Sequence, residues 1–261
     1  MREDRGEIEA AEADTLPRLV SQHDVLGDFR VGSHWGDGAN GLDQIAQAAR
    51  KMGYQYVAVC DAAYSAATGR GLSPEELEQQ IASIELMNAA LPDDFRLLAG
   101  VEVDLSPDGD LQGPAELLQT CDVVVAAART GLIEPRRQLT RRLCRAMENP
   151  LVHVLAPPPW RQTGDPEMPP VDMDAILETA AATHTCLEIS SHPLRAGLPD
   201  VHVRHATERG IMLTLGSGAQ RICDMQSMAL GVTTARRGWA EPRHLLNTRP
   251  LPAVMQFLKK A

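Results

Sequence analysis

The six residues DVVVAA at positions 122–127 decide the fold class. After Asp122 the chain has six apolar residues in a row, 123–128, without the polar alternation of a strand that has one face in water. Such an uninterrupted run is typical of a parallel strand whose two faces are both covered. Leu139 and Leu143 then lie one turn apart in the segment 136–147, which predicts an amphipathic helix directly after the strand. A strand followed by a helix is the repeating unit of α/β proteins.

The same unit recurs on both sides of this segment. Further strands are predicted at 29–31, 56–61, 96–104, 152–155, 186–190 and 211–215, and further helices at 42–52, 73–90, 173–183 and 200–209. About seven strands that alternate with helices favour a closed or nearly closed parallel barrel at this length. A doubly wound open sheet is the alternative, but no GxGxxG motif follows the first strand.

The predicted fold is therefore α/β, a distorted (β/α)7 TIM-like barrel that occupies residues 26–261. Residues 1–25 form a leading segment that lies before the first strand and has no counterpart in the repeat. Residues 156–170 hold six of the 18 prolines and are predicted to be a loop after the fifth strand.

The composition excludes several classes of protein. The longest apolar run, 123–128, is far shorter than the roughly 20 residues that span a bilayer, and the acidic N-terminus lacks the apolar core of a signal peptide. A net charge of −10 disfavours a stand-alone nucleic-acid binder, because such binding depends on Lys and Arg at the phosphates. The five cysteines form no CxxC pair and are predicted to be reduced thiols of a cytoplasmic protein.

In a barrel of this type the chemistry lies at the C-terminal ends of the strands. Of the eight histidines, only His34 and His192 fall in strand-end loops, so the residues alone predict no metal site. Three arginines on different strand-end loops could form a phosphate-facing rim or could be solvated charges: Arg161, Arg195 and Arg221. The basic segment 136–145 is interpreted first as a barrel-covering helix and only second as a DNA-binding stripe.

The strand-end motifs resemble a known family. The motifs are GDFRVGSHWGDGAN at 27–40, GYQYVAVCDAAYSAATGRGLS at 53–73, LLAGVEVDLSPDG at 97–109, DVVVAAARTG at 122–131, LEISSHPLRAGLPD at 187–200 and GVTTARRGWAEPRHLLNT at 231–248. Through them, residues 27–260 resemble the C-terminal PHP (polymerase and histidinol phosphatase) domain of family X DNA polymerases from bacteria and archaea. Residues 2–12 resemble the end of the polymerase thumb and its linker, so Met1 is interpreted as a start codon placed inside a longer protein.

The resemblance implies a cluster of three metal ions held by nine ligands, but this sequence departs from that pattern. Asp37 and Glu102 match two of the ligands, and Asp61 keeps the acidic residue of a motif whose histidine is lost. The seven other ligand positions are occupied by Arg30, Gly32, Ala62, Arg129, Pro157, Gly218 and Gln220. The loss of even one ligand usually weakens a metal site greatly.

We therefore expect a degenerate, metal-free PHP domain with a structural, regulatory or DNA-positioning role in a base-excision-repair polymerase. Arg30 and Arg129 are predicted to extend into the site and to pair with Asp37 and Glu102, because buried carboxylates need compensating charge. The simpler alternatives are that Asp37 caps a turn and that Glu102 accepts hydrogen bonds from backbone amides. The expected partners are the polymerase core of the same protein and, through it, DNA.

A second function from the enzyme class stays open. Asp37, Glu102, Asp61 and His34 could hold one weakly bound Mn²⁺ or Mg²⁺ ion and support a residual phosphodiesterase or 3′–5′ exonuclease activity. A free-standing interaction protein is the third hypothesis, and the thumb-like segment 2–12 disfavours it.

Overall fold

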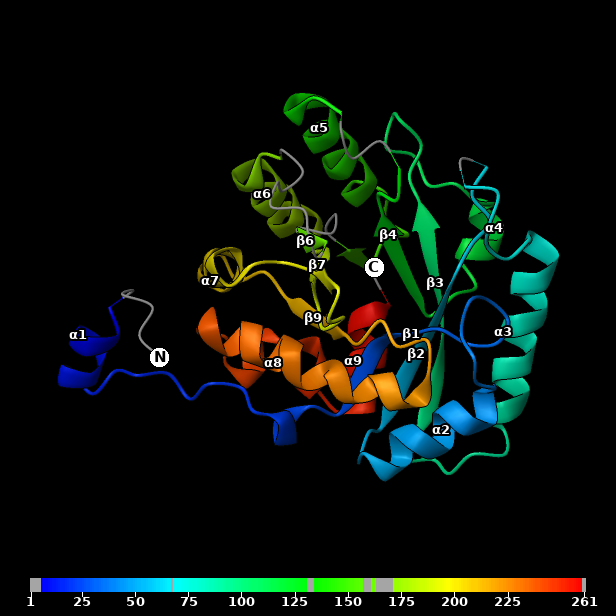
Figure 1. Cartoon of the computed structure of the whole chain (residues 1–261), viewed down its shortest axis with the longest axis horizontal. Coiled ribbons are helices and arrows are strands. Elements are labelled where there is room, and N and C mark those ends of the chain that lie inside the picture. Colours follow the sequence, from blue (N-terminus) through cyan, green and yellow to red (C-terminus); the bar gives the residue numbers. More distant parts are fainter. Residues whose placement is uncertain (1–5, 67, 131–133, 157–160, 163–170, 260–261) are drawn as a thin grey trace.

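The computed structural model describes residues 6–66, 68–130, 134–156, 161–162 and 171–259. Seven parallel strands form one sheet in the order β1-β2-β3-β4-β5-β7-β9 (Figure 1). They are β1 Gly27–Val31, β2 Tyr56–Ala62, β3 Arg96–Asp104, β4 Val123–Ala127, β5 Val154–Ala156, β7 Cys186–Ser190 and β9 Leu213–Gly216. Two short antiparallel strands, β6 Arg161–Gln162 and β8 Arg195–Ala196, pair with each other. The predicted parallel α/β barrel is confirmed.

The helices surround the sheet (Figure 1). The α-helices are α1 Glu7–Glu12, α2 Leu42–Lys51, α3 Pro74–Asn88, α4 Ala115–Leu118, α5 Arg136–Met147, α6 Met173–Thr183, α7 Asp200–Glu208, α8 Met228–Arg237 and α9 Leu251–Leu258, and the 3₁₀ turns are η1 Gln22–Asp24, η2 Ile222–Ser227, η3 Pro242–His244 and η4 Leu246–Thr248. The start of α3 follows from its sequence, because Ser73 and Glu76 form a reciprocal capping box.

Two apolar clusters divide the interior. The larger cluster lies between the helices and the outer face of the sheet. The smaller one fills the inside of the barrel, where Phe29 and Tyr56 meet Val254 and Leu258 of α9. Because α9 follows the last strand and closes the base of the barrel, the opposite end, at the C-terminal ends of the strands, is left open for a site.

The barrel is closed between β1 and β9 by two buried side chains and by backbone hydrogen bonds at the strand ends, such as that from the Gly218 amide to the Arg30 carbonyl at 2.9 Å, rather than by a continuous ladder. Asn247 is fully buried, and its amide donates to the carbonyls of Gly27 and Leu215, at 2.8 and 2.9 Å. Its Oδ1 accepts a hydrogen bond of 2.6 Å from the Leu215 amide. Asp28 is equally buried, and its Oδ1 accepts from the Ser217 amide at 3.0 Å. Two polar side chains thus hold the first and last strands together.

The second half of the leading segment packs on the barrel. Val20 and Val25 are buried in the larger apolar cluster, and the Val20 amide donates to the Ala240 carbonyl at 2.9 Å. Arg236 donates to the Val20 carbonyl at 2.8 Å. In Figure 1, α1 lies apart from the barrel. Among the described residues, no helix is long and apolar enough to cross a membrane.

Asp28 makes the closure dependent on pH. Burial raises its pKa from 3.8 to about 6, although hydrogen bonds from Ser217 and Arg30 oppose the shift. Since the folded state then binds more protons than the unfolded state between pH 4 and 6, the stability from this residue falls as pH rises through that window. Asparagine does not titrate in this range. When the pH is raised from 4 to 7.5, we therefore expect the free energy of unfolding of Asp28→Asn to rise by about 3 kcal/mol relative to that of the wild type, measured by urea unfolding at each pH. A difference between the two proteins that does not change with pH would contradict this assignment.

Candidate functional site

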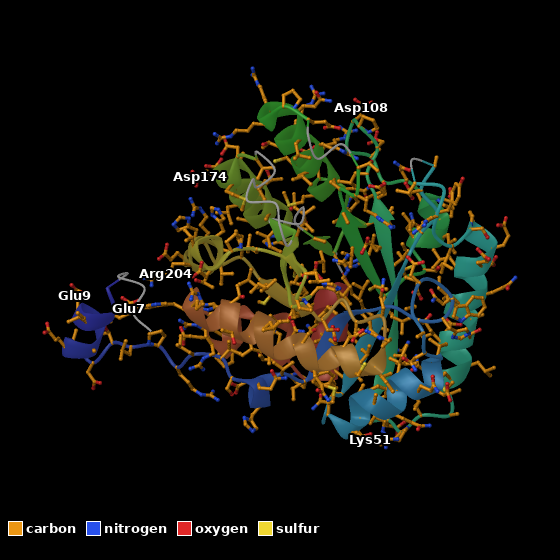
Figure 2. All side chains as sticks on the ribbon, in the orientation of Figure 1. Glu7, Glu9, Lys51, Asp108, Asp174 and Arg204 are labelled. Atoms are coloured by element: carbon orange, nitrogen blue, oxygen red, sulfur yellow. The ribbon has the colours of Figure 1, made fainter. Side chains whose placement is uncertain are left out.

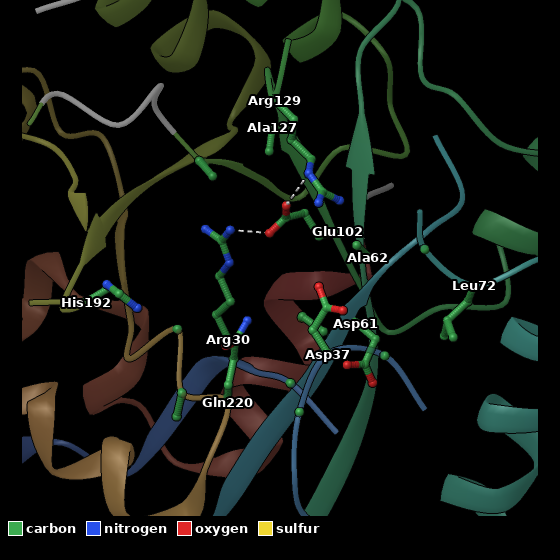
Figure 3. Close-up of a pocket in the computed structure, with 18 of the residues that line it drawn as sticks. Arg30, Asp37, Asp61, Ala62, Leu72, Glu102, Ala127, Arg129, His192 and Gln220 are labelled. Atoms are coloured by element: carbon green, nitrogen blue, oxygen red, sulfur yellow. Dashed lines mark hydrogen bonds and ion pairs between the residues drawn. The ribbon is translucent and has the colours of Figure 1, made fainter. Parts of the chain in front are cut away.

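A cavity of about 570 Å³ opens at the C-terminal ends of the strands (Figure 3). Arg30 on β1, Asp61 on β2, Glu102 on β3 and Glu188 on β7 line it, together with Arg129, which follows β4. The replaced ligand positions Gly32, Ala62, Gly218 and Gln220 also line the cavity, whereas Pro157 lies outside the described residues. The strand ends therefore bring together most of the positions that the sequence singled out.

Arg30 joins two acidic residues that come from opposite parts of the barrel. Its Nη1 donates to Oε2 of Glu188 at 2.7 Å, and its Nη2 contacts Oε2 of Glu102. Figure 3 shows the Arg30 and Glu102 side chains pointing toward each other across the cavity. Gly216 makes room for this arrangement, because a Cβ at that position would collide with Oε1 of Glu188.

Arg129 approaches the same carboxylate from the other side. Its Nε lies 3.6 Å from Oε1 of Glu102, and its backbone amide donates to Asp104 at 3.0 Å. Both arginines thus pair with Glu102, as the sequence predicts. The predicted pairing with Asp37 is wrong: within the described part of the chain Asp37 has no ion pair, and it is exposed at the mouth of the cavity.

Glu188 is the site residue that the sequence reasoning missed. Its side chain is only 3% exposed, and Arg30 neutralises it. The signal was a single acidic residue among the apolar residues of the strand Cys186–Ser190, which ends in a serine. Alternate residues of a strand share a face, and Cys186 points into the barrel, so Glu188 points inward as well.

Burial sets the electrostatics of the cavity. Desolvation lowers the pKa of Arg30 while Glu102 and Glu188 raise it, and the net shift is upward, so the guanidinium stays charged. Burial raises the pKa of Glu188, and Arg30 opposes that shift. Burial also raises the pKa of the Cys60 thiol well above its usual value, so this residue is a poor nucleophile.

Asp61 is held in its own hydrogen-bond network. It accepts from the Ser33 amide at 2.8 Å, from the Ser33 hydroxyl at 2.6 Å and from the side chain of Gln80. Burial nevertheless raises its pKa. Both of its oxygens are therefore engaged, by Ser33 in the turn after β1 and by Gln80 of α3, which indicates a structural role for this carboxylate.

The remaining predicted positions lie away from the ion pairs. His34 is exposed and stacks at an angle on Trp35. His192 lines the cavity, and its Nδ1 accepts from the Leu194 amide at 3.1 Å. Arg221 is exposed and pairs with Asp224. The backbones of Arg161 and Arg195 lie in β6 and β8, and their side chains fall outside the description, so the phosphate-facing rim stays a prediction.

The residues present do not fit a metal cluster. Within the part of the chain that the structure describes, no three His, Cys, Asp or Glu side chains are placed so that they could share a metal ion. The charges of Glu102 and Glu188 are already balanced by Arg30, which lies between them, and by Arg129 beside Glu102, and a metal cation added there would be repelled by the two guanidiniums. Transition metals prefer imidazole ligands, and among the described residues that line the cavity His192 is the single histidine, with its Nδ1 already accepting from the Leu194 amide.

Known proteins are similar to this chain in sequence or in fold. The chain is 35% identical over 260 residues to the DNA polymerase/3'-5' exonuclease PolX of Bacillus subtilis, and the match covers 100% of this chain but only 45% of that relative. It is 33% identical over 104 residues to a probable phosphatase of Clostridium acetobutylicum, which is 39% of this chain and 40% of that protein. No family model matches the chain.

Among solved structures, the barrel is similar to histidinol phosphate phosphatase from Lactococcus lactis, which was determined with zinc, L-histidinol and phosphate. The TM-score is 0.58, the identity is 14%, and the match covers 82% of this chain and 94% of that one. At this identity the likeness concerns the fold alone. The likeness to this solved structure supports the barrel fold of the chain.

Proposed function

We propose that this PHP-domain protein, related over its length to part of PolX, is a non-hydrolytic module in which arginine side chains take the place of metal cations. The observation that carries the proposal is the Arg30 guanidinium between Glu102 and Glu188. Two buried carboxylates without a partner would be costly. One fixed cation between them, with Arg129 beside Glu102, keeps the strand ends together without a metal ion.

We further propose a polymerase-linked context for the module. The chain spans 45% of the PolX relative, so the polymerase activity expected from the resemblance would belong to other parts of a longer protein. The leading segment 1–25 would connect them, and its packing through Val20 onto the barrel supports a fixed connection. The role that follows is structural: the barrel positions the polymerase core and the DNA relative to each other.

The proposal predicts that metal ions neither bind nor stabilise the chain. We expect substoichiometric Mn²⁺ and Zn²⁺ by elemental analysis, and the same thermal midpoint with EDTA as with Mn²⁺. A site filled at 100 times its Kd would add about 2.7 kcal/mol, which a thermal midpoint would reveal. We also expect Mn²⁺ to produce no cleavage of a 3′-labelled oligonucleotide above that of a buffer control.

Asp37→Ala is the matched variant for the alternative function, because Asp37 is exposed and its removal does not disturb the ion pairs. Stoichiometric Mn²⁺ together with an oligonucleotide cleavage that Asp37→Ala abolishes would overturn the proposal. That outcome would establish the residual exonuclease or phosphodiesterase instead.

A further inference from the structure

Helix α5 presents a column of arginines on its outer face. Arg137, Arg141 and Arg145 follow one another at intervals of four residues, and all three are exposed. The opposite face is buried through Leu139, Leu143, Ala146 and Met147. The helix therefore has one face committed to the barrel and one basic face that packing does not need.

The charge of this helix is unfavourable for the helix itself. Arg136 and Arg137 occupy its first turn, which contains no acidic residue, although the N-terminus of a helix favours negative charge. Arginines four residues apart also repel each other. The packing of the barrel does not need these exposed arginines, and they stand together in a chain whose net charge is −10. The arrangement indicates an anionic partner.

The acidic neighbours pair only with the last arginine of the column and with Arg136, which precedes the column. Arg136 pairs with Asp172 at 3.4 Å and Arg145 with Asp110 at 3.5 Å, both as exposed pairs. Asp108 and Asp174 lie on either side of α5 in Figure 2, and Asp174 is paired with Arg209. Among the described residues, Arg137 and Arg141 have no ion pair.

We propose that the outer face of α5 binds the phosphate backbone of DNA, with Arg137 and Arg141 as its central contacts. The guanidinium group suits phosphate oxygens because it donates two parallel hydrogen bonds. From Arg137 to Arg145 the column is about 12 Å long, which spans several phosphates of one strand. The helix also begins at the open end of the barrel, a short distance along the chain from Arg129 in the cavity.

The DNA context of this inference rests on the proposed function, but its test is separate from the metal experiments. Binding of the 261-residue chain to a fluorescent duplex oligonucleotide is measured by anisotropy over a series of salt concentrations. We expect the double variant Arg137→Gln, Arg141→Gln to bind about tenfold more weakly. The slope of log K against log salt should become shallower by about 2, because each lost phosphate contact contributes about 0.9.

The matched control is Arg50→Gln with Lys51→Gln, which removes the same charge from an exposed helix end on the opposite edge of the molecule (Figures 1 and 2). This control should bind as the wild type does, and the unfolding curves of both variants should match the wild-type curve. Equal weakening in the two double variants, or no binding by the wild type at low salt, would overturn the proposal.

Discussion

Replacing Arg30 by methionine is expected to lower the free energy of unfolding at pH 8 by about 3–5 kcal/mol. Methionine keeps much of the length of the side chain but leaves Glu188, which is 3% exposed, without its only described ion-pair partner. Glu102 would keep only its contact of 3.6 Å with Arg129. The measurement is urea unfolding followed by circular dichroism.

The pH dependence of this loss identifies its cause. Without the guanidinium, burial alone raises the pKa of Glu188 further above its unfolded value, so the stability of the variant falls as pH rises. The cost of the substitution should therefore be smaller at pH 5 than at pH 8. A cost that is the same at both values would indicate lost packing rather than an unpaired carboxylate.

Arg129→Met is the matched control for Arg30→Met. Arg129 carries the same charge in the same cavity, but its side chain is 25% exposed and makes a single ion pair. We expect a loss of about 1 kcal/mol, as for a partly exposed pair. Equal losses for the two variants would contradict the central position that we assign to Arg30.

The fold could be predicted from the sequence because parallel strands that are buried on both faces appear in it as short, uninterrupted apolar runs. The predicted segments 96–104, 136–147, 173–183 and 186–190 coincide with β3, α5, α6 and β7. The four-residue helix α4 was not predicted, because it is too short to show a helical period. The last strand begins at Leu213 rather than at residue 211, because the apolar run does not distinguish strand from the turn before it.

The candidate site was predictable only where a residue's position along a strand fixed its direction. Glu102 and Arg30 were placed correctly, since strand ends converge in a barrel. Asp37 lies in a turn, whose backbone conformation is not readable from the pattern, and its side chain faces solvent. Arg142 belongs to the basic segment 136–145, yet it is 2% exposed and donates to the carbonyls of Ser106 and Thr130. Pattern analysis treats every arginine as a surface residue.

The apolar pattern of the sequence also could not predict how the barrel is closed between β1 and β9. This closure gives the second large expected effect. Replacing Asn247 by alanine should lower the free energy of unfolding by about 3–5 kcal/mol, because the Gly27 carbonyl and both backbone groups of Leu215 lose their side-chain partner in a buried place. Native domains are stable by only about 5–15 kcal/mol. The loss is measured by urea unfolding, and hydrogen exchange should locate it at the adjoining strand ends of β1 and β9.

Asn88→Ala tests whether the loss of stability depends on the burial of Asn247 and not on the removal of any asparagine that bonds the backbone. The Asn88 side chain also bonds both backbone groups of one residue, Leu97, at 2.8 and 2.9 Å, but it is only partly buried at the end of α3. Water can replace those bonds, so we expect a cost of about 1 kcal/mol. If Asn247→Ala does not fold, slow exchange of the Leu215 amide in the wild type still tests the closure, because this amide should be protected as strongly as those in the centre of the sheet. Rapid exchange there would show that the first and last strands separate readily, which contradicts a closure held by Asn247.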